Sequence, residues 1–405
     1  AEQTRKWRIC KIPPHLVHWR ECVGRADRIS PSQAREIRTV MSDLKSARAA
    51  AESGARLSRE DALLLYKDND LLALAAWARA AKERASGRNV YYTVNRHINL
   101  TNICSANCPL CAFQVEQGDA RGYIMETDDV ARVLETAKHT PRLTEIHIVS
   151  ALHPDRPFSY YEGVVRQVRA ALPDADIKAF TPVEIVNFAK TEGMSVRSIL
   201  SALQEAGLSS LPGGGAEILS DRVRAVICPN KATRAEWLDC MRTAHALGIR
   251  TNASMMYGHI ETVEERIDHL LSLRDLQDET GGFQAFMLFP FHPENTALGA
   301  EKKLARVGSW EDMKMLALSR LVLDNITHFK AFWVMLTQPI AQLALGFGAD
   351  DLDGTIGEEK IIHAAGATTQ TGITRRELDA MIREAGYEPV ERDTFYRPIA
   401  AGEGA

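Results

Sequence analysis

From residue 90 onward, two patterns of apolar and polar positions follow one another along the chain. Short apolar runs of strand character are each followed by a longer segment whose apolar residues recur at helical spacing. The predicted strands are Val90–Leu100, Thr144–Leu152, Asp176–Pro182, Leu208–Gly214, Ile249–Gly258, Phe283–Phe289 and His328–Leu336. Strand and helix alternating over roughly 300 residues predict a parallel sheet with right-handed crossovers. Seven or eight such units favour an α/β fold of the closed (β/α)8 TIM-barrel type.

Capping residues mark where helices begin. Ser58, with Asp61 three positions on, predicts the start of an N-terminal helical segment that ends at Gly87. Threonine followed three residues later by glutamate marks further helix starts at Thr233, Thr262 and Thr374. The predicted domains are a loosely ordered basic arm (1–44), an N-terminal helical extension (45–88), the barrel (89–345) and a C-terminal barrel-closing loop and helix (346–405).

Composition narrows the class of protein. Of 405 residues, 45% are hydrophobic, which is enough for a large core, and the net charge of −4 argues against a nucleic-acid partner. No apolar run is long enough to span a membrane, and no apolar segment follows the basic N-terminal residues as in a secretory signal. Seven cysteines without disulfide-like spacing suit a reducing compartment, so we expect a cytoplasmic protein. The sequence leaves the oligomeric state open.

Three of the cysteines form a compact cluster. Cys104, Cys108 and Cys111 lie in "NICSANCPLCAF", directly after the first predicted strand. A structural zinc site takes four protein ligands, whereas a 4Fe–4S cluster held by three thiolates keeps one iron open to another ligand. We therefore expect one 4Fe–4S cluster per chain bound by these thiols. The alternative is a zinc site in a metal-stabilised binding module without enzymatic activity.

The cysteine spacing resembles that of the radical S-adenosylmethionine (SAM) superfamily, and other phrases point to one branch of it. These phrases are "NRHIN" (95–99), "KAFTPVEI" (178–185), "LPGGGAEI" (211–218), "YGHIET" (257–262), "HPENT" (292–296) and "GADDLDGTIGEEKIIHAAG" (348–366). They are similar to the branch that contains aminofutalosine synthases, dehypoxanthine futalosine cyclases and the 5-deazaflavin (FO) synthase subunits. The combination of "NRHIN" with "HPENT" most resembles the first of these three groups.

The resemblance implies a radical SAM barrel and a reaction. S-adenosyl-L-methionine would be a consumed co-substrate, and an electron donor such as flavodoxin or ferredoxin would reduce the cluster. The 5′-deoxyadenosyl radical would add to 3-[(1-carboxyvinyl)oxy]benzoate, and rearrangement with decarboxylation would give 6-amino-6-deoxyfutalosine for menaquinone biosynthesis. The alternatives are the cyclase reaction, which releases 5′-deoxyadenosine, and the FO synthase reaction, which uses tyrosine and a pyrimidine.

The resemblance also implies a set of SAM-binding residues. They are Ser150 and Ala151, where related enzymes have two glycines beside the methionine amine, Glu184 for the ribose, and Ser254, Met256, Gly258 and Glu261 around the adenine. Glu184 could instead be a helix-start carboxylate, and Met256 could be core packing. The chain also departs from the family at Leu110, where an aromatic residue is usual, and over residues 287–290.

Strand alternation suggests further candidates for catalysis or substrate binding. Asn95, His97 and Asn99 share one face of the first strand, which aims His97 into the barrel, where it is either functional or a satisfied core histidine. Arg96 could pair with a substrate carboxylate or form a surface ion pair. His153, His259 and His292 follow strands and are candidates for proton transfer or carboxylate binding, or are structural.

Overall fold

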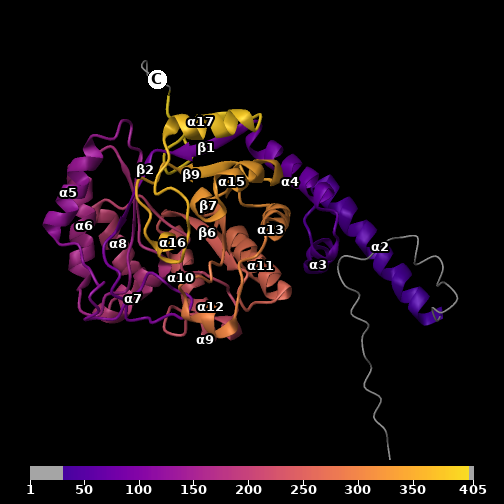
Figure 1. The fold of residues 1–405 in the computed structure, drawn as a ribbon, viewed down its shortest axis with the longest axis horizontal. Helices are drawn as coiled ribbons and strands as arrows, with labels where there is room; N and C mark the ends of the chain where they lie inside the picture. Colours follow the sequence, from indigo (N-terminus) through magenta and orange to yellow (C-terminus); the bar gives the residue numbers. More distant parts are fainter. Residues whose placement is uncertain (1–30, 401–405) are drawn as a thin grey trace, which may run out of the picture.

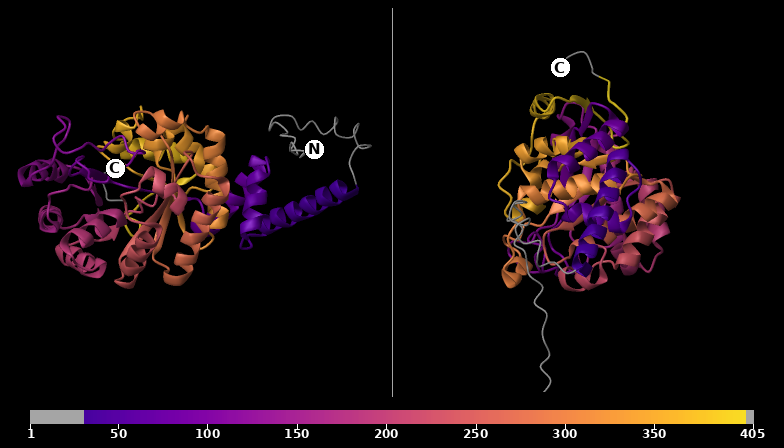
Figure 2. Two further views of the ribbon diagram at one scale, coloured as in Figure 1. Left: turned by 90° about the horizontal axis from the view of Figure 1, so that it is seen from below. Right: turned by 90° about the vertical axis from the view of Figure 1, so that its right-hand side faces the viewer.

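The computed structural model describes residues 31–400, in which ten parallel strands form one curled sheet with helices on its outside (Figures 1 and 2). The strands are β1 (Asn89–Thr93), β2 (Asn95–Asn99), β3 (Glu145–Val149), β4 (Asp176–Ala179), β5 (Ser210–Leu211), β6 (Arg250–Tyr257), β7 (Phe283–Pro290), β8 (His328–Lys330), β9 (Asp351–Gly354) and β10 (Glu388–Glu391). Their order is β10-β1-β9-β8-β7-β6-β5-β4-β3-β2. All seven predicted strand regions therefore contain strands, and the parallel sheet is confirmed.

The sheet closes on itself through a single run of chain. β1 and β2 are separated only by Val94; β1 pairs with β9, and β2 pairs with β3. Just beyond β9, the carbonyl oxygen of Ile356 accepts a hydrogen bond from the backbone N–H of His97 at 3.0 Å. The N–H of Asn95 donates to Oγ1 of Thr355, also at 3.0 Å. The two ends of the sheet thus meet at residues 89–99, which gives the predicted α/β barrel.

Helices surround the barrel and extend from it on one side. They are α2 (Pro31–Ser53), α3 (Arg59–Lys67), α4 (Leu71–Ser86), α5 (Thr127–Lys138), α6 (Phe158–Ala171), α7 (Pro182–Glu192), α8 (Val196–Ala206), α9 (Asp221–Ile227), α10 (Arg234–Ala246), α11 (Val263–Thr280), α12 (Ala297–Lys302), α13 (Ser309–Val322), α14 (Trp333–Leu336), α15 (Gln338–Ala344), the 3₁₀ helix η2 (Leu345–Phe347), α16 (Ile361–Ala364) and α17 (Arg375–Glu384). α3 packs on α11 and α13, α4 packs on α13, and α2 projects outward (Figure 1). Within residues 31–400, no helix is both long and apolar enough for a membrane span.

The N-terminal extension is helical but interrupted. Ser58 caps α3 in a capping box with Asp61, as predicted, yet the expected single helical segment is two helices. The backbone of Asp68 is extended, and Asp70 caps the second helix by accepting the N–H of Ala73 at 3.1 Å. The capping boxes predicted at Thr233, Thr262 and Thr374 are all present. Residues 1–30 of the predicted arm (1–44) lie outside the described residues, and residues 31–44 belong to α2.

The expected closing loop after residue 346 contains strands. Residues 351–354 form β9, which completes the barrel between β8 and β1, and residues 388–391 form β10 on the outer side of β1. Asp351 and Asp353 are uncommon in strands, because their side chains compete for backbone hydrogen bonds. Here both are buried and paired with cations, Asp351 with Arg392 and Asp353 with Lys330. Long-range ion pairing, which a local pattern does not reveal, balances the two buried carboxylates within the strand.

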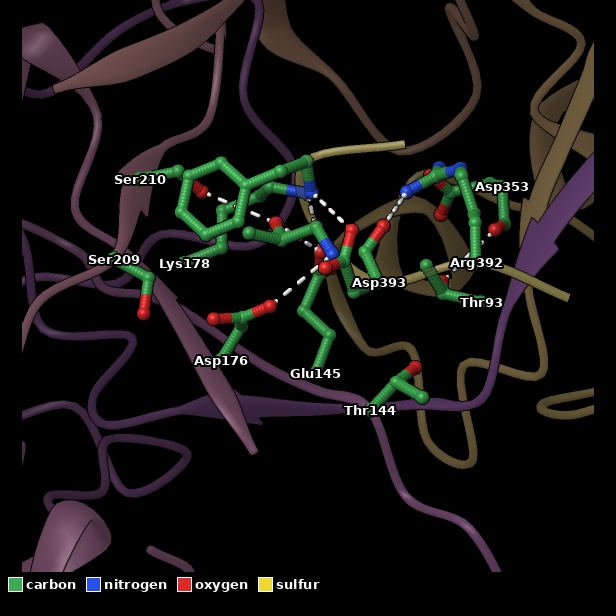
Figure 3. A network of polar contacts seen from close by, with 12 residues as sticks. Thr93, Thr144, Glu145, Asp176, Lys178, Ser209, Ser210, Asp353, Arg392 and Asp393 are labelled. Carbon is green, nitrogen blue, oxygen red and sulfur yellow. Dashed lines mark hydrogen bonds and ion pairs between the residues drawn. The ribbon is translucent and has the colours of Figure 1, made fainter. Parts of the chain in front are cut away.

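A short segment after β10, Arg392–Tyr396, lies against the amino ends of the strands, and we call it the C-terminal plug. Figure 3 shows Arg392 and Asp393 of this segment in one polar network with Glu145 and Asp176. The hydroxyl of Thr394 donates to Glu145 at 2.6 Å, and its backbone N–H donates to Asp176 at 3.2 Å. Nε and Nη2 of Arg392 both donate to Oδ2 of Asp351, at 2.8 and 2.5 Å. Glu145, Asp176 and Asp351 are the first residues of β3, β4 and β9, so the plug ties the starts of three strands together.

We predict that Arg392→Ala destabilises the protein by about 3–5 kcal/mol, because it leaves the Asp351 carboxylate buried without a partner. Both side chains of this pair are 0% exposed. Arg397→Ala is the matched control: it removes an ion pair with Asp393 from a side chain that is 71% exposed, and it costs at most about 1 kcal/mol. Chemical denaturation of the three proteins measures both values. Equal stabilities for the two variants would contradict the assigned role of the plug.

Candidate functional site

A cavity of about 290 Å³ occupies the carboxyl-end half of the barrel. The loop that follows β2 lines this central cavity, together with residues that follow β3, β4, β5, β8 and β9. Side chains that point inward from the strands form its floor. Much of its wall is apolar and includes Met256, Met287, Phe289, Phe332 and Met335. Such a cavity, with a few polar groups among apolar walls, is the usual form of a small-molecule site.

The loop after β2 carries the three clustered cysteines to the edge of this cavity. Cys104 and Cys111 line it, and Cys108 is buried beside it. Backbone hydrogen bonds fix the loop: the N–H of Cys104 donates to Val115 at 3.0 Å, and that of Ser105 donates to Leu152 at 2.8 Å. The loop therefore holds the thiols at the mouth of the barrel, as the sequence predicted. No three His, Cys, Asp or Glu side chains among residues 38–400 are gathered as a single-ion site.

An ion pair that the sequence analysis did not single out lies beside the cysteines. Lys231 Nζ and Glu217 Oε1 are 2.6 Å apart, and both residues line the cavity. Burial opposes the charge of Lys231, but Glu217 and the nearby thiols, including Cys108, raise the pKa of its ammonium well above the ordinary value. Burial raises the pKa of the Cys108 thiol to about 12, against the influence of Lys231. A cation is thus fixed where thiolates would form.

Ser150, Ala151 and Glu184 come together at the ends of β3 and β4 and all line the cavity. Oε1 of Glu184 accepts the backbone N–H of Ser150 at 2.7 Å, and Oε2 accepts the N–H and hydroxyl of Thr181 at 2.7 and 2.8 Å. Glu184 is therefore the capping-box residue of α7 as well as a cavity residue. Burial raises its pKa to about 7, although these hydrogen bonds favour the ionised form.

On β6, the predicted face splits in two. Asn252, Ser254 and Met256 line the cavity, with the Ser254 hydroxyl donating to the carbonyl of Gly213 at 2.6 Å. Gly258 and Glu261 do not line it. Glu261 instead accepts the backbone N–H of Gly258 at 2.6 Å and Nε of Arg266 at 2.7 Å, which fixes the turn that leads into α11. The cavity thus receives the strand residues but not those of the turn after it.

Of the six candidates for catalysis or substrate binding, only His97 lines the cavity. Asn95 accepts the N–H of Ile356 at 2.6 Å and so helps to close the barrel. Arg96 lines a separate cavity with Tyr123 and Lys360 on the other side of β2. The remaining three bond to backbone groups. Nδ1 of His153 accepts the N–H of Asp155 and Nδ1 of His259 accepts that of Ile260, whereas Nε2 of His292 donates to the carbonyl oxygen of Met335.

The floor of the cavity contains residues that sequence reasoning missed. They are His147, Lys178, Lys330 and Asp353, which join His97 there. A signal was present for the lysines, since "IKAF" and "FKAF" each place one lysine inside an apolar strand. A charged residue in a strand buried on both faces requires a partner or a function. The alternation along β3 predicts that His147 faces inward, but no local pattern shows that it lies beside His97.

The arrangement combines a soft-metal ligand set with an enclosed, largely apolar chamber. Three thiols can bind three irons of a cube, and each thiolate binds a different iron, so they need not converge on one point. Lys231 offsets negative charge beside them, and the apolar walls exclude water from the chamber. The chain therefore has the groups for a cluster at the mouth and for a polar ligand at the floor.

Comparisons with known proteins agree with this arrangement. Residues 98–273 match the Radical SAM superfamily, and residues 280–403 match the CofH/MqnC C-terminal region. The chain is 45% identical to the aminodeoxyfutalosine synthase of Thermus thermophilus over 85% of its own length and 93% of the relative. It is 40% identical to a 5-amino-6-(D-ribitylamino)uracil–L-tyrosine 4-hydroxyphenyl transferase of Methanococcoides burtonii, over 84% and 96%. The fold matches that of methylornithine synthase (PylB), with a TM-score of 0.68, 15% identity, and coverage of 85% and 97%.

We predict that Glu184 makes the stability of the metal-free protein fall as pH rises. Its folded pKa of about 7 lies above the ordinary 4.5, so the folded state binds the extra proton, and this contribution is lost as pH rises through the folded value. A shift of this size corresponds to roughly 3 kcal/mol. Between pH 5 and pH 8, the free energy of unfolding, measured by urea denaturation, should fall by roughly 3 kcal/mol less for Glu184→Gln than for the wild type. Parallel pH profiles for the two proteins would refute the raised pKa.

Proposed function

Because the chain belongs to the radical SAM superfamily, in the branch that contains the aminodeoxyfutalosine synthases, we propose that it is an aminodeoxyfutalosine synthase. The proposed substrates are S-adenosylmethionine and 3-[(1-carboxyvinyl)oxy]benzoate. The adenosyl C5′ carbon joins the vinyl carbon, and the ether carbon–oxygen bond breaks as the vinyl unit moves to the aromatic ring. The carboxylate of that unit leaves as carbon dioxide or bicarbonate, the remaining unpaired electron would return to the oxidised cluster, and the product is 6-amino-6-deoxyfutalosine for menaquinone biosynthesis. The observation that carries this proposal is the 45% identity over 93% of the Thermus thermophilus synthase.

The residues at the mouth of the cavity fit the cofactors that this activity requires. Cys104, Cys108 and Cys111 would each bind one iron of a 4Fe–4S cluster, and the hydroxyl of Ser150 is buried there with no partner in the described chain. When bound, the cluster supplies one electron to S-adenosylmethionine, which then yields the 5′-deoxyadenosyl radical. The Lys231 ammonium stabilises the negative charge of the thiolates.

Other side chains position S-adenosylmethionine and exclude water. Glu184 fixes the backbone of Ser150, so the segment after β3 presents its polar groups to the methionine end of the ligand. Ser254 and Met256 face the cavity from β6, where the adenine would lie. Met287, Phe289 and Phe332 present no N–H or O–H groups to the chamber, so they exclude water from the place where the reactive radical would form.

We further propose that an electron donor such as flavodoxin or ferredoxin reduces the cluster at the cysteine loop. Five cysteines of the described chain, Cys104, Cys108, Cys111, Cys228 and Cys240, are free thiols. Free thiols and an oxygen-sensitive cluster support a reducing compartment, which we take to be the cytoplasm.

A second candidate function is the 4-hydroxyphenyl transferase reaction named for the archaeal relatives. The chain is 40% identical to the Methanococcoides burtonii transferase and covers 96% of it. The chain is 45% identical to the synthase and 40% identical to the transferase, so we prefer the synthase reaction. Product analysis separates the two, and it separates both from the cyclase reaction.

We predict that Cys108→Ser abolishes cluster assembly, whereas Cys240→Ser does not. The wild type, reconstituted without oxygen, should bind about four irons and four sulfides per chain. Cys240 is the matched control, because it is a buried free thiol on α10 away from the cavity. Iron and sulfide analysis, with circular dichroism to verify folding, measures the outcome. A folded Cys108→Ser protein with full iron content would exclude the proposed ligand set.

We predict that the reduced enzyme joins the adenosyl group of S-adenosylmethionine to 3-[(1-carboxyvinyl)oxy]benzoate. Mass spectrometry should find the adenine moiety in the product, with equimolar methionine and no stoichiometric release of 5′-deoxyadenosine. Release of 5′-deoxyadenosine from dehypoxanthine futalosine would indicate the cyclase instead. An adduct formed only with tyrosine and the ribitylaminouracil would indicate the 4-hydroxyphenyl transferase.

A further inference from the structure

The floor of the central cavity is one layer of side chains that the sheet register aligns. His97 on β2 lies opposite His147 on β3, and His147 lies opposite Lys178 on β4. Lys330 on β8 and Asp353 on β9 line the floor from the other side of the barrel. These five side chains, which we call the polar floor, lie deeper in the barrel than the cysteine loop, because that loop begins only after β2 ends.

The two imidazoles of the polar floor are adjacent, and one nitrogen of each has no hydrogen-bond partner among the described residues. Their ring centroids are 4.5 Å apart with the planes at 62°, and Nε2 of each is buried without a hydrogen-bond partner in the described residues. His97 is only 8% exposed, yet both rings line the cavity. Buried polar atoms without partners are rare, because their desolvation is not offset. Two such atoms on adjacent rings, both lining one end of a cavity, indicate a ligand that is polar at that end.

The hydrogen-bond donors around the imidazoles, rather than a net charge, favour an acceptor group such as a carboxylate as this ligand, because Glu145, Asp353 and Glu359 also face His97. Lys178 donates to Glu145, and Lys330 donates to Asp353 at 2.5 Å, so each ammonium has further hydrogens available. Burial lowers the pKa of both imidazoles, that of His147 to about 3, so they are neutral and each carries one N–H. Neutral imidazoles add donors without adding charge, and each lysine, although its charge is balanced by a carboxylate, offers its remaining N–H groups. A carboxylate has two acceptor oxygens for two such donors.

We propose that His97 and His147 bind the ring carboxylate of the benzoate substrate, with Lys178 and Lys330 behind them. This inference rests on the proposed function, since it takes its ligand from that reaction. With the ring carboxylate at the polar floor, the enol ether points toward the cysteine loop, where the adenosyl radical forms. The polar floor then selects the substrate and sets its direction, while the apolar walls around Met287 and Phe289 hold the aromatic ring.

The test compares two ligands on wild type and variants. One ligand is 3-[(1-carboxyvinyl)oxy]benzoate, and the other is the same enol ether without the ring carboxylate. Equilibrium dialysis of the cluster-loaded enzyme, with S-adenosylmethionine and without reductant, measures both affinities before any turnover. The wild type should prefer the diacid by roughly tenfold to a hundredfold, the range for hydrogen bonds to a charged group.

His147→Phe keeps the ring volume and removes the nitrogen, so it should lose this preference while its affinity for the monoacid stays unchanged. His147→Gln keeps a donor and should restore part of the preference. His139→Phe, the same substitution at the exposed end of α5, is the matched control and should behave as the wild type. Should His147→Phe fail to fold or to bind iron, His147→Gln and the corresponding His97 variants decide the outcome by the same ratio.

Two results overturn the inference: a wild type with no preference for the diacid, or variants at both histidines that keep the wild-type preference. If the two imidazoles bind only water and have a purely structural role, the variants will keep the wild-type preference, which is the second result. Turnover of the wild type is measured separately. If the wild type converts the diacid but the variants keep its preference, the carboxylate assignment fails and the proposed function stands. If the wild type prefers the diacid but forms no adduct, the proposed function fails and the carboxylate subsite remains.

Discussion

The structure depends on one stretch of chain, residues 89–99, that must pair on both sides at once. β1 contacts β9 and β10, β2 contacts β3, and a single residue, Val94, separates the two strands. This double pairing sets the register of the barrel. It turns His97 inward, places Arg96 outside, and delivers the chain to the mouth of the barrel at the position where the cysteine loop begins. The positions of the thiols and of the polar floor follow from the same hydrogen bonds.

The interior of the barrel is charged at two levels, and each level is balanced locally. At the amino end, Arg392 pairs with Asp351 and the hydroxyl of Thr394 donates to Glu145. One layer deeper, Lys178 reaches the same Glu145 from the cavity side (Figure 3). Glu145 thus connects the plug to the polar floor. Buried ion pairs add little net stability, but they fix geometry, because breaking one leaves a charge without a partner. The plug at the amino end of the barrel therefore helps to position Lys178 in the polar floor, because both contact Glu145.

Sequence patterns predicted the repeated parts of this architecture and missed the parts made by long-range pairing. Strands with apolar runs, three threonine capping boxes and the cysteine loop were readable, because each is a local signal. β9 was not, since its aspartates resemble a loop until Arg392 and Lys330 are placed beside them. α3 and α4 are separate helices because the backbone of Asp68 is extended, which the sequence pattern did not indicate. The pair Lys231–Glu217 spans 14 residues with no periodic signal, and its importance emerges only beside the thiols.

The C-terminal plug also has a consequence for how the protein is made. Thr394 binds Glu145 across 249 positions of sequence, and Arg392 binds Asp351 across 41. During synthesis, Asp351 is therefore made 41 positions before its partner Arg392, and the amino end of the barrel gains these contacts only once the plug has been made.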